Sequence, residues 1–278
     1  VQYRYRPDSA VSLDLNLDVG YTNFELDVGN FINVNNATIG GTFRPEMGIR
    51  AGDWGRFTLG SELGLSWFDL YITAPSPNPD WDGCDQPLLR QEIPSEVYFQ
   101  PAIYLDAEFR PIPQLRLTAG LRTERYDTHD EWVFEPRFWI NWEAREGTDI
   151  EAAFGIYHQQ ADPANTSEVF GNPNLPVERS TQVSLGVKQR IWGPVSASVT
   201  GFFKWMDRLA VPTDELVERD GEMVPLRNTD TGRGRIYGME LMVRAEPTEH
   251  FFGWLSYTLM RSERQDAEGE PWNVYDFD

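Results

Sequence analysis

The sequence predicts an all-β protein, an antiparallel up-and-down transmembrane β-barrel to which this chain contributes about twelve strands. Three observations lead to this prediction: apolar and polar residues alternate along many segments, the connections are alternately short and long, and aromatic residues gather toward segment ends. Strict alternation over six to eight residues indicates a strand with one apolar face. No stretch approaches the ~18 continuous apolar residues that a membrane-spanning helix needs.

The alternation is clearest in residues 115–122, where odd positions are apolar and even positions are polar or small. Residues 150–157, 183–188, 195–200 and 239–244 repeat the same pattern. No helical period competes with it. On this basis strands are expected near residues 11–18, 22–29, 38–49, 56–72, 97–109, 115–126, 132–144, 149–160, 177–191, 195–208, 233–245 and 251–263.

The connections between these segments differ in length in a regular way. Short turns are expected at 110–114, 145–148, 192–194 and 246–249. Longer polar loops are expected at 73–96, 161–176 and 209–232, with the tail after Glu263 as a candidate fourth and a short break near 126–130 as the exception. Short turns on one side and long loops on the other are typical of outer-membrane barrels, whereas a soluble β-sandwich has no reason to sort its loops this way.

The two faces of the predicted strands differ in chemistry. Aromatic residues near the strand ends fit the interfacial girdles of a membrane barrel, although a soluble β-sandwich core would also use them. Polar residues opposite the apolar face are expected to face a wet lumen. The lumen-facing set is Arg116, Arg122, Glu124, Arg137, Asn141, Glu151, Lys188, Glu240 and Arg244.

The net charge, the single cysteine and the two chain ends each indicate what else this chain interacts with or belongs to. A formal net charge of -20 would repel nucleic-acid phosphates, so no nucleic-acid partner is expected. Cys84 is the single cysteine and is interpreted as an isolated thiol or as one half of a bridge to a residue outside this chain. Val1 begins mid-pattern and Asp278 follows no closing strand, so the chain is expected to be a piece of a longer polypeptide.

No motif in the sequence indicates catalysis, and no enzyme activity is expected. The three histidines have no second histidine at metal-ligand spacing, and neither a nucleophile elbow nor a phosphate loop is present. An acidic cluster of Asp80, Asp82 and Asp85 lies in the 73–96 loop. Such hard oxygen ligands can bind calcium, but the spacing lacks the EF-hand pattern, so a solvated acidic loop is the favoured interpretation and no cofactor is expected.

The second half of the chain contains a series of short motifs. These motifs are Phe134-Glu135-Pro136-Arg137, the strand 149–157 followed by His158-Gln159, the stretch from Phe170-Gly171-Asn172-Pro173 to Glu178-Arg179-Ser180, Asn228 with Gly234 to Glu240, the strand 255–263, and Phe277-Asp278. In this order and spacing they resemble the β-barrel of TonB-dependent outer-membrane receptors. The resemblance runs from about Phe134 to Asp278, and the Gly-Asn-Pro…Glu-Arg stretch is its most specific part.

The resemblance implies a larger barrel of about 22 strands closed around an N-terminal plug in the bacterial outer membrane. It also implies import of a scarce ligand, such as a ferric siderophore, cobalamin or a glycan, with energy delivered by TonB. Residues 1–278 would then be a partial barrel domain without plug or closing strand, in contact with outer-membrane lipid, and TonB would act through N-terminal parts of the parent. The Gly-Asn-Pro…Glu-Arg element is interpreted as structural, because Asn-Pro favours a turn and Pro176 restricts its predecessor to extended geometry.

Residues near the loop-side strand ends are the candidates for ligand contact at the outer mouth. Arginine and aromatic groups suit anionic or glycan-like molecules. A passive porin-like barrel and a soluble β-sandwich carbohydrate-binding module are the alternative functions. The candidate ligand-binding residues are Arg122, Arg125, Tyr126, Tyr157, His158, Gln159 and Arg208.

Overall fold

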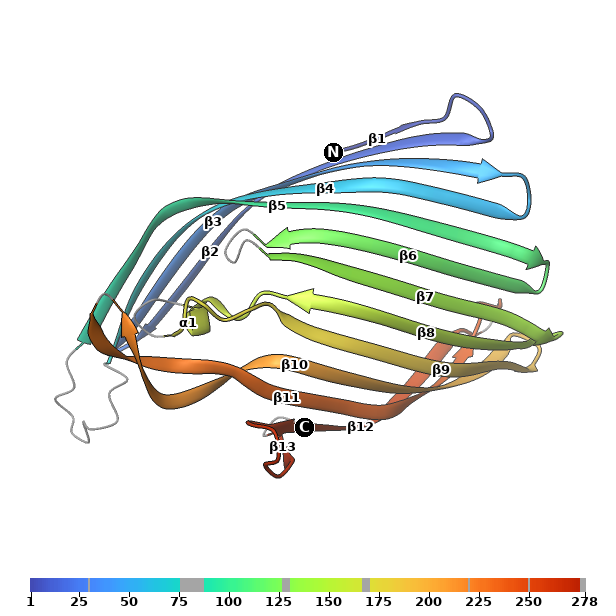
Figure 1. Ribbon diagram of the computed structural model, residues 1–278. Helices are drawn as coiled ribbons and strands as arrows, with labels where there is room; N and C mark the ends of the chain where they lie inside the picture. Colours follow the sequence, from blue (N-terminus) through green and yellow to red (C-terminus); the bar gives the residue numbers. More distant parts are fainter. Residues whose placement is uncertain are drawn as a thin grey trace.

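The chain forms one sheet in the computed structural model, in which every strand pairs with its neighbours in the sequence (Figure 1). The strand order is β1 to β13 without a crossover, and every pair is antiparallel. The structure describes residues 1–29, 31–75, 88–126, 131–166, 171–219, 221–249 and 251–275. This is the predicted up-and-down arrangement of a barrel wall, and a single sheet is not a β-sandwich.

The strands are long, and most are far longer than the strands of ordinary globular domains. A short helix, α1 (Pro163–Thr166), lies in the connection between the eighth and ninth strands. Among the described residues no helix is long and apolar enough to cross a membrane. The strands are β1 (Gln2–Tyr5), β2 (Val11–Val28), β3 (Ile32–Ala51), β4 (Gly55–Pro75), β5 (Leu88–Ile112), β6 (Leu115–Tyr126), β7 (Glu131–Arg145), β8 (Thr148–Gln159), β9 (Glu178–Trp192), β10 (Val195–Arg219), β11 (Glu222–Ala245), β12 (Gly253–Gln265) and β13 (Asn273–Val274).

The sheet curves into an open wall with β1 at one edge and β13 at the other (Figure 1). The connections after β5, β7 and β9 lie together at one end, which we call the turn end, and each is very short. At the opposite end, the loop end, β5 extends well past β6, β10 extends past β9, and β11 extends past β12. The predicted short turns at 110–114, 145–148 and 192–194 are therefore confirmed at one end, but the predicted long loop 209–232 at the other end is not, because β10 ends at Arg219 and β11 begins at Glu222.

Several predictions about strand boundaries are wrong. The predicted loop 73–96 is partly strand, because β4 continues to Pro75 and β5 begins at Leu88, and β3 begins at Ile32 instead of near residue 38. The segments 11–18 and 22–29 form the single strand β2, because Val19, Gly20 and Tyr21 continue the ladder opposite Gly41, Gly40 and Ile39. The predicted loop 209–232 is mostly strand, since β10 continues to Arg219 and β11 begins at Glu222.

The extension of β10 and β11 escaped prediction for a physical reason. Register shifts occur between Met206 and Leu209, between Leu209 and Val211, and between Thr213 and Leu216, so the period of two is interrupted repeatedly. β-Bulges of this kind shift side chains between the faces of a strand. The part of β10 and β11 that extends beyond the neighbouring strands does not face lipid. It therefore needs no apolar face, and its sequence has the composition of a loop.

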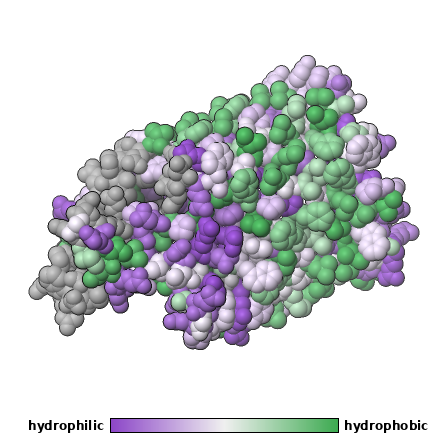
Figure 2. All heavy atoms as spheres, viewed as in Figure 1, coloured by the Kyte–Doolittle hydropathy of each residue, from purple (hydrophilic) through white to green (hydrophobic). Residues whose placement is uncertain are grey.

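The outward face of the sheet is apolar, as predicted. On β12 the outward residues Leu255, Tyr257 and Leu259 are each more than half exposed, so this surface lacks a protein partner. Figure 2 shows hydrophobic residues gathered over the half of the sheet nearer the turn end, with hydrophilic residues at the rim and toward the loop end. Such a band bounded by polar rims is the surface that a barrel presents to lipid.

Aromatic rings border the apolar band at both ends. At the turn end Trp54 stacks on Phe109, with ring centroids 6.2 Å apart, and Trp192 is 76% exposed. At the loop end Phe203 contacts Trp205 and Tyr237, with centroids 4.1 and 5.7 Å apart. On β12 the band is bounded by Gly253 at the turn end and by Arg261 at the loop end. These bounds are about 27 Å apart at ~3.4 Å per residue, or about 20 Å in height for a strand tilt of ~40°, close to the ~25 Å band of outer-membrane barrels.

Candidate functional site: the polar inner wall

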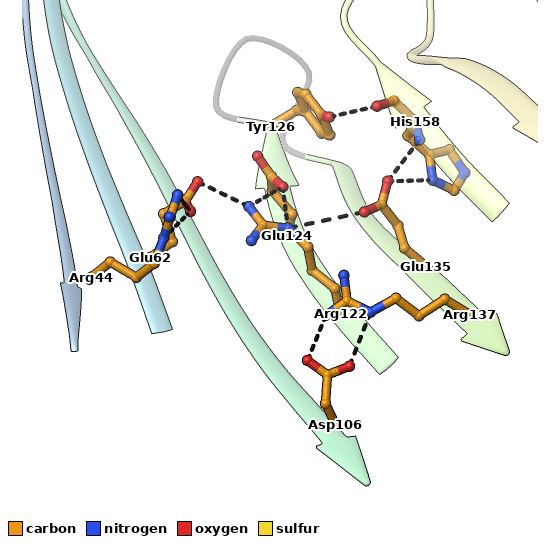
Figure 3. Close-up of polar contacts among 9 residues, drawn as sticks. All are labelled: Arg44, Glu62, Asp106, Arg122, Glu124, Tyr126, Glu135, Arg137 and His158. Atoms are coloured by element: carbon orange, nitrogen blue, oxygen red, sulfur yellow. Dashed lines mark hydrogen bonds and ion pairs between the residues drawn. The ribbon is translucent and has the colours of Figure 1, made fainter. Parts of the chain in front are cut away.

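The inner face of β3 to β8 has a network of charged side chains across its loop-end half (Figure 3). Arg122 on β6 lies at the centre of this inner-wall network. Its Nη2 donates to Glu124 at 2.7 Å and to Glu62 at 3.2 Å, and its Nε lies 3.9 Å from Glu135. Arg44 on β3 donates through its Nε to Glu62 at 2.7 Å, so the network spans five strands.

Side chains on strands that are not adjacent can meet because the strand between them has a small residue at the facing position. Asp106, Gly120 and Arg137 are aligned on β5, β6 and β7, and Gly120 leaves the space over β6 open. Arg137 donates to the two oxygens of Asp106 at 3.0 and 2.7 Å, a bidentate pair that bridges β5 and β7.

The same arrangement occurs one strand earlier. Glu46, Gly60 and Tyr104 are aligned on β3, β4 and β5. The Tyr104 ring lies over Gly60, and its hydroxyl donates to Glu46 at 2.9 Å. In each case a glycine in the middle strand allows its two neighbours to form a hydrogen bond, which stiffens the inner wall.

The end of β8 pairs with β9 on one side, and on its other side the hydrogen bonds come from side chains instead of from the backbone of β7. The β7–β8 pairing ends at Arg137 and Gly155, while β8 continues to Gln159 along β9. The backbone N–H of His158 donates to Glu135 at 2.6 Å, and its carbonyl accepts from the Tyr126 hydroxyl at 3.1 Å (Figure 3). Side chains of β6 and β7 thus satisfy the polar backbone groups that β7 no longer pairs.

The segment between β8 and β9 folds onto the inner wall. Val177 is fully buried against Tyr126 and Val133, and Leu175 packs with Ala161 and Ala210. We call the described residues of this connection, 160–166 and 171–177, the inner segment. Figure 1 shows its helix α1 beside the loop-side end of β8.

Two asparagines attach the inner segment to β11. The buried Asn172 side chain donates through Nδ2 to the backbone carbonyl of Asn228 at 2.9 Å, and its Oδ1 accepts from the Asn174 N–H at 3.0 Å. The Asn172 N–H donates to the Asn165 carbonyl at 2.7 Å. The motifs that contain Asn172 and Asn228 therefore meet in space, and their contacts are structural.

The structure places the predicted ligand-binding residues in different surroundings. Arg122, Tyr126 and His158 belong to the inner-wall network, and Arg208 forms an ion pair with Glu131 at 3.1 Å. Tyr157 and Gln159 are exposed beyond the point where β8 leaves β7. Arg125 pairs with Trp132 in the outward row, away from the other candidates.

The predicted calcium ligands Asp80, Asp82 and Asp85, together with Cys84, lie outside the described residues. Calcium binding therefore stays a prediction. In the part of the chain that the structure describes, no three His, Cys, Asp or Glu side chains are grouped as a metal site.

Sequence reasoning identified lumen-facing residues but missed most of their partners. Glu62, Asp106 and Glu135 are the carboxylates that hold Arg122, Arg137 and His158, and none was a candidate. Alternation assigns a side chain to a face, but only the register between strands decides which charges lie opposite each other. The glycines at 60 and 120 are the signal that could have indicated these contacts.

Residues 1–275 match the family described as TonB dependent receptor-like, beta-barrel. The chain belongs to this family. This receptor barrel therefore lies in the outer membrane, and the predicted family and location are confirmed. No curated protein matches its sequence.

Solved structures share the fold of the receptor barrel at low sequence identity. The outer membrane transporter YddB from Escherichia coli is 10% identical with a TM-score of 0.60, over 95% of this chain and 47% of that one. The pyoverdine receptor FpvA from Pseudomonas aeruginosa PAO1, bound to pyoverdine, is 14% identical with a TM-score of 0.63, over 94% and 42%. The copper transporter OprC is 14% identical with a TM-score of 0.58, over 95% and 48%. The chain thus spans less than half of each of these proteins.

Proposed function

We propose that this barrel is part of a receptor that imports a scarce ligand across the outer membrane, with energy supplied through TonB. The observation that supports this most directly is the inner segment, which packs on the inner wall through Leu175 and Val177. A barrel interior filled by a loop or a helix is typical of plugged barrels, whereas porins keep a water-filled channel. The activity of the proposed receptor is transport, not catalysis.

The ligand class follows from the groups that the inner wall leaves available. Tyr157 and Gln159 are exposed, and the inner-wall network behind them is fixed by carboxylate contacts. Aromatic and amide groups on a rigid wall suit stacking and hydrogen bonding to polar organic molecules. We therefore propose a ferric siderophore, cobalamin or a glycan as the ligand class.

The test measures uptake of labelled ferric siderophore, cobalamin and oligosaccharide by cells that produce the receptor, with and without TonB. We expect one ligand class to enter only when TonB is present. Tyr157→Ala should weaken binding of that ligand by about tenfold, the loss expected for a buried aromatic contact. Trp192→Ala, at the outward turn end, is the matched control and should leave binding unchanged. Uptake that is equal without TonB would show a passive pore instead.

A further inference from the structure

A charged cluster interrupts the outward face of β11 and β12 at its loop end. Arg235 and Arg261 both donate to Glu263, through their Nε groups, at 2.5 and 2.8 Å. The Glu263 side chain is only 5% exposed, whereas Arg261 is 53% exposed. The Trp272 ring lies 4.3 Å from the Arg235 guanidinium and covers one of its faces.

The cluster has one positive charge in excess, because two guanidinium groups share one carboxylate. Each arginine uses its Nε–H on Glu263, which leaves the terminal Nη groups as donors. Within the described ranges of the chain, neither guanidinium makes another hydrogen bond or ion pair. Arginine donors arranged as a fork match the oxygens of phosphate.

An apolar groove of about 740 Å³ runs from this cluster into the lipid-facing band. Its floor is open because Gly201 has no side chain between Leu185 and Met239 in the cross-strand row. A Cβ at Gly201 would meet nothing closer than 3.9 Å. The outward-facing lining residues are Gly201, Tyr237, Met239, Leu259, Arg261 and Val274.

The position of the cluster corresponds to the membrane–water boundary. Pairing aligns Phe203, Tyr237 and Arg261 in one outward row, and the next row toward the turn end is Leu185, Gly201, Met239 and Leu259. The outward face therefore changes from apolar to aromatic and charged within one row. Since the longer connections of outer-membrane barrels are extracellular, this boundary belongs to the outer leaflet.

We infer that Arg261 and Arg235 bind the phosphate of an outer-leaflet glycolipid, with an acyl chain of that lipid in the adjacent groove. The excess positive charge complements the phosphate, and the groove is open to the bilayer along its length. This site lies on the outside of the barrel wall, so it does not depend on the transport ligand proposed above.

The test titrates the purified receptor, in detergent, with lipid A, with dephosphorylated lipid A and with phosphatidylglycerol, and measures bound lipid by native mass spectrometry. We expect binding of lipid A, and Arg261→Gln should weaken it by about tenfold, the loss expected for a hydrogen bond to a charged group. Arg235 still pairs with Glu263 in this variant, so the buried carboxylate keeps a partner. Gly201→Leu should also weaken binding by filling the groove without changing charge.

Arg244→Gln is the control, because it removes the same charge from an exposed arginine at the turn end, on the inner face. It should leave lipid A binding unchanged, and an equal loss in both arginine variants would overturn the proposed site. Equal binding of dephosphorylated lipid A would overturn the role of the phosphate. Equal binding of phosphatidylglycerol would overturn the choice of a glycolipid, and normal binding by Gly201→Leu would overturn the groove.

Discussion

Gly120 occupies the inner face of β6 directly between Asp106 and Arg137. An added Cβ would overlap the Asp106 carboxylate and lie 2.7 Å from Arg137 Nε. Gly60 has the same relation to Tyr104 and Glu46. At the residue scale, the inner wall thus depends on the absence of side chains at defined positions as much as on the charges themselves.

Gly120→Ala is expected to displace the Asp106–Arg137 pair and to destabilise the barrel. Overpacking typically costs about 1–3 kcal/mol, and the partly exposed ion pair contributes about 1 kcal/mol or less. The measurement is the free energy of unfolding in urea, in lipid vesicles. Gly201→Ala is the matched control because its Cβ has space, and it should change stability by about 0.5 kcal/mol or less. Equal effects would show that Gly120 is not required for the pair.

At the scale of elements, the inner segment shows how a connection between strands is held in place by tertiary contacts. Its described residues contain one turn of helix, α1, so its position depends on contacts with the sheet. Leu175 and Val177 supply apolar burial, and Asn172 attaches the segment to the carbonyl of Asn228 on β11. The motif that most strongly indicated the family therefore joins two distant parts of the chain.

Asn172→Ala should release the inner segment, because it removes the donor to the buried Asn228 carbonyl and the acceptor for the Asn174 N–H. An unsatisfied buried carbonyl costs about 1–3 kcal/mol. Hydrogen exchange of residues 171–177 should accelerate by roughly tenfold or more. Asn228→Ala retains its backbone carbonyl and should have a smaller effect. If Asn228→Ala proves the more damaging, the segment is attached in another way.

At the scale of the whole molecule, the wall separates two solvents. Leu105, Leu121 and Pro136 form one outward row, and Thr118 faces the lumen on the same strand as Leu121. The polar face meets water and charged partners, whereas the apolar face meets lipid. This separation explains how a chain with a mean hydropathy of -0.49 can belong in a membrane.

Leu121→Arg should destabilise the barrel by about 2–4 kcal/mol if the residue lies near the bilayer midplane. Thr118→Arg places the same charge in the lumen near Glu108 and should cost about 1 kcal/mol or less. Unfolding in lipid vesicles measures both variants. Equal costs would mean that the two faces see the same solvent, and the outward assignment would then be wrong.

The sequence was sufficient for most of the fold because alternation and loop length are local signals. Strands β6 to β9 begin and end close to their predicted boundaries, and the lumen-facing Arg116, Asn141 and Glu151 are aligned in one cross-strand row. Prediction failed where the ladder contains bulges, as in β10 near Arg208, whose φ is 60°. It also divided β2, because the apolar residues change from odd positions up to Tyr21 to even positions from Phe24, without interrupting the ladder.

The sequence by itself determined the strand class, which residues share a face of each strand, and the family, since these follow from periods and motifs within single segments. Only the tertiary structure decided which residues meet: Arg122 with Glu62, Asn172 with Asn228, and Arg235 and Arg261 with Glu263. The reason is that cross-strand register is a property of pairs of strands. A shift of one residue between strands would change the Arg122–Glu62 and Arg235–Glu263 contacts and exchange the two faces, and the Asn172–Asn228 contact depends on how the inner segment packs on the sheet.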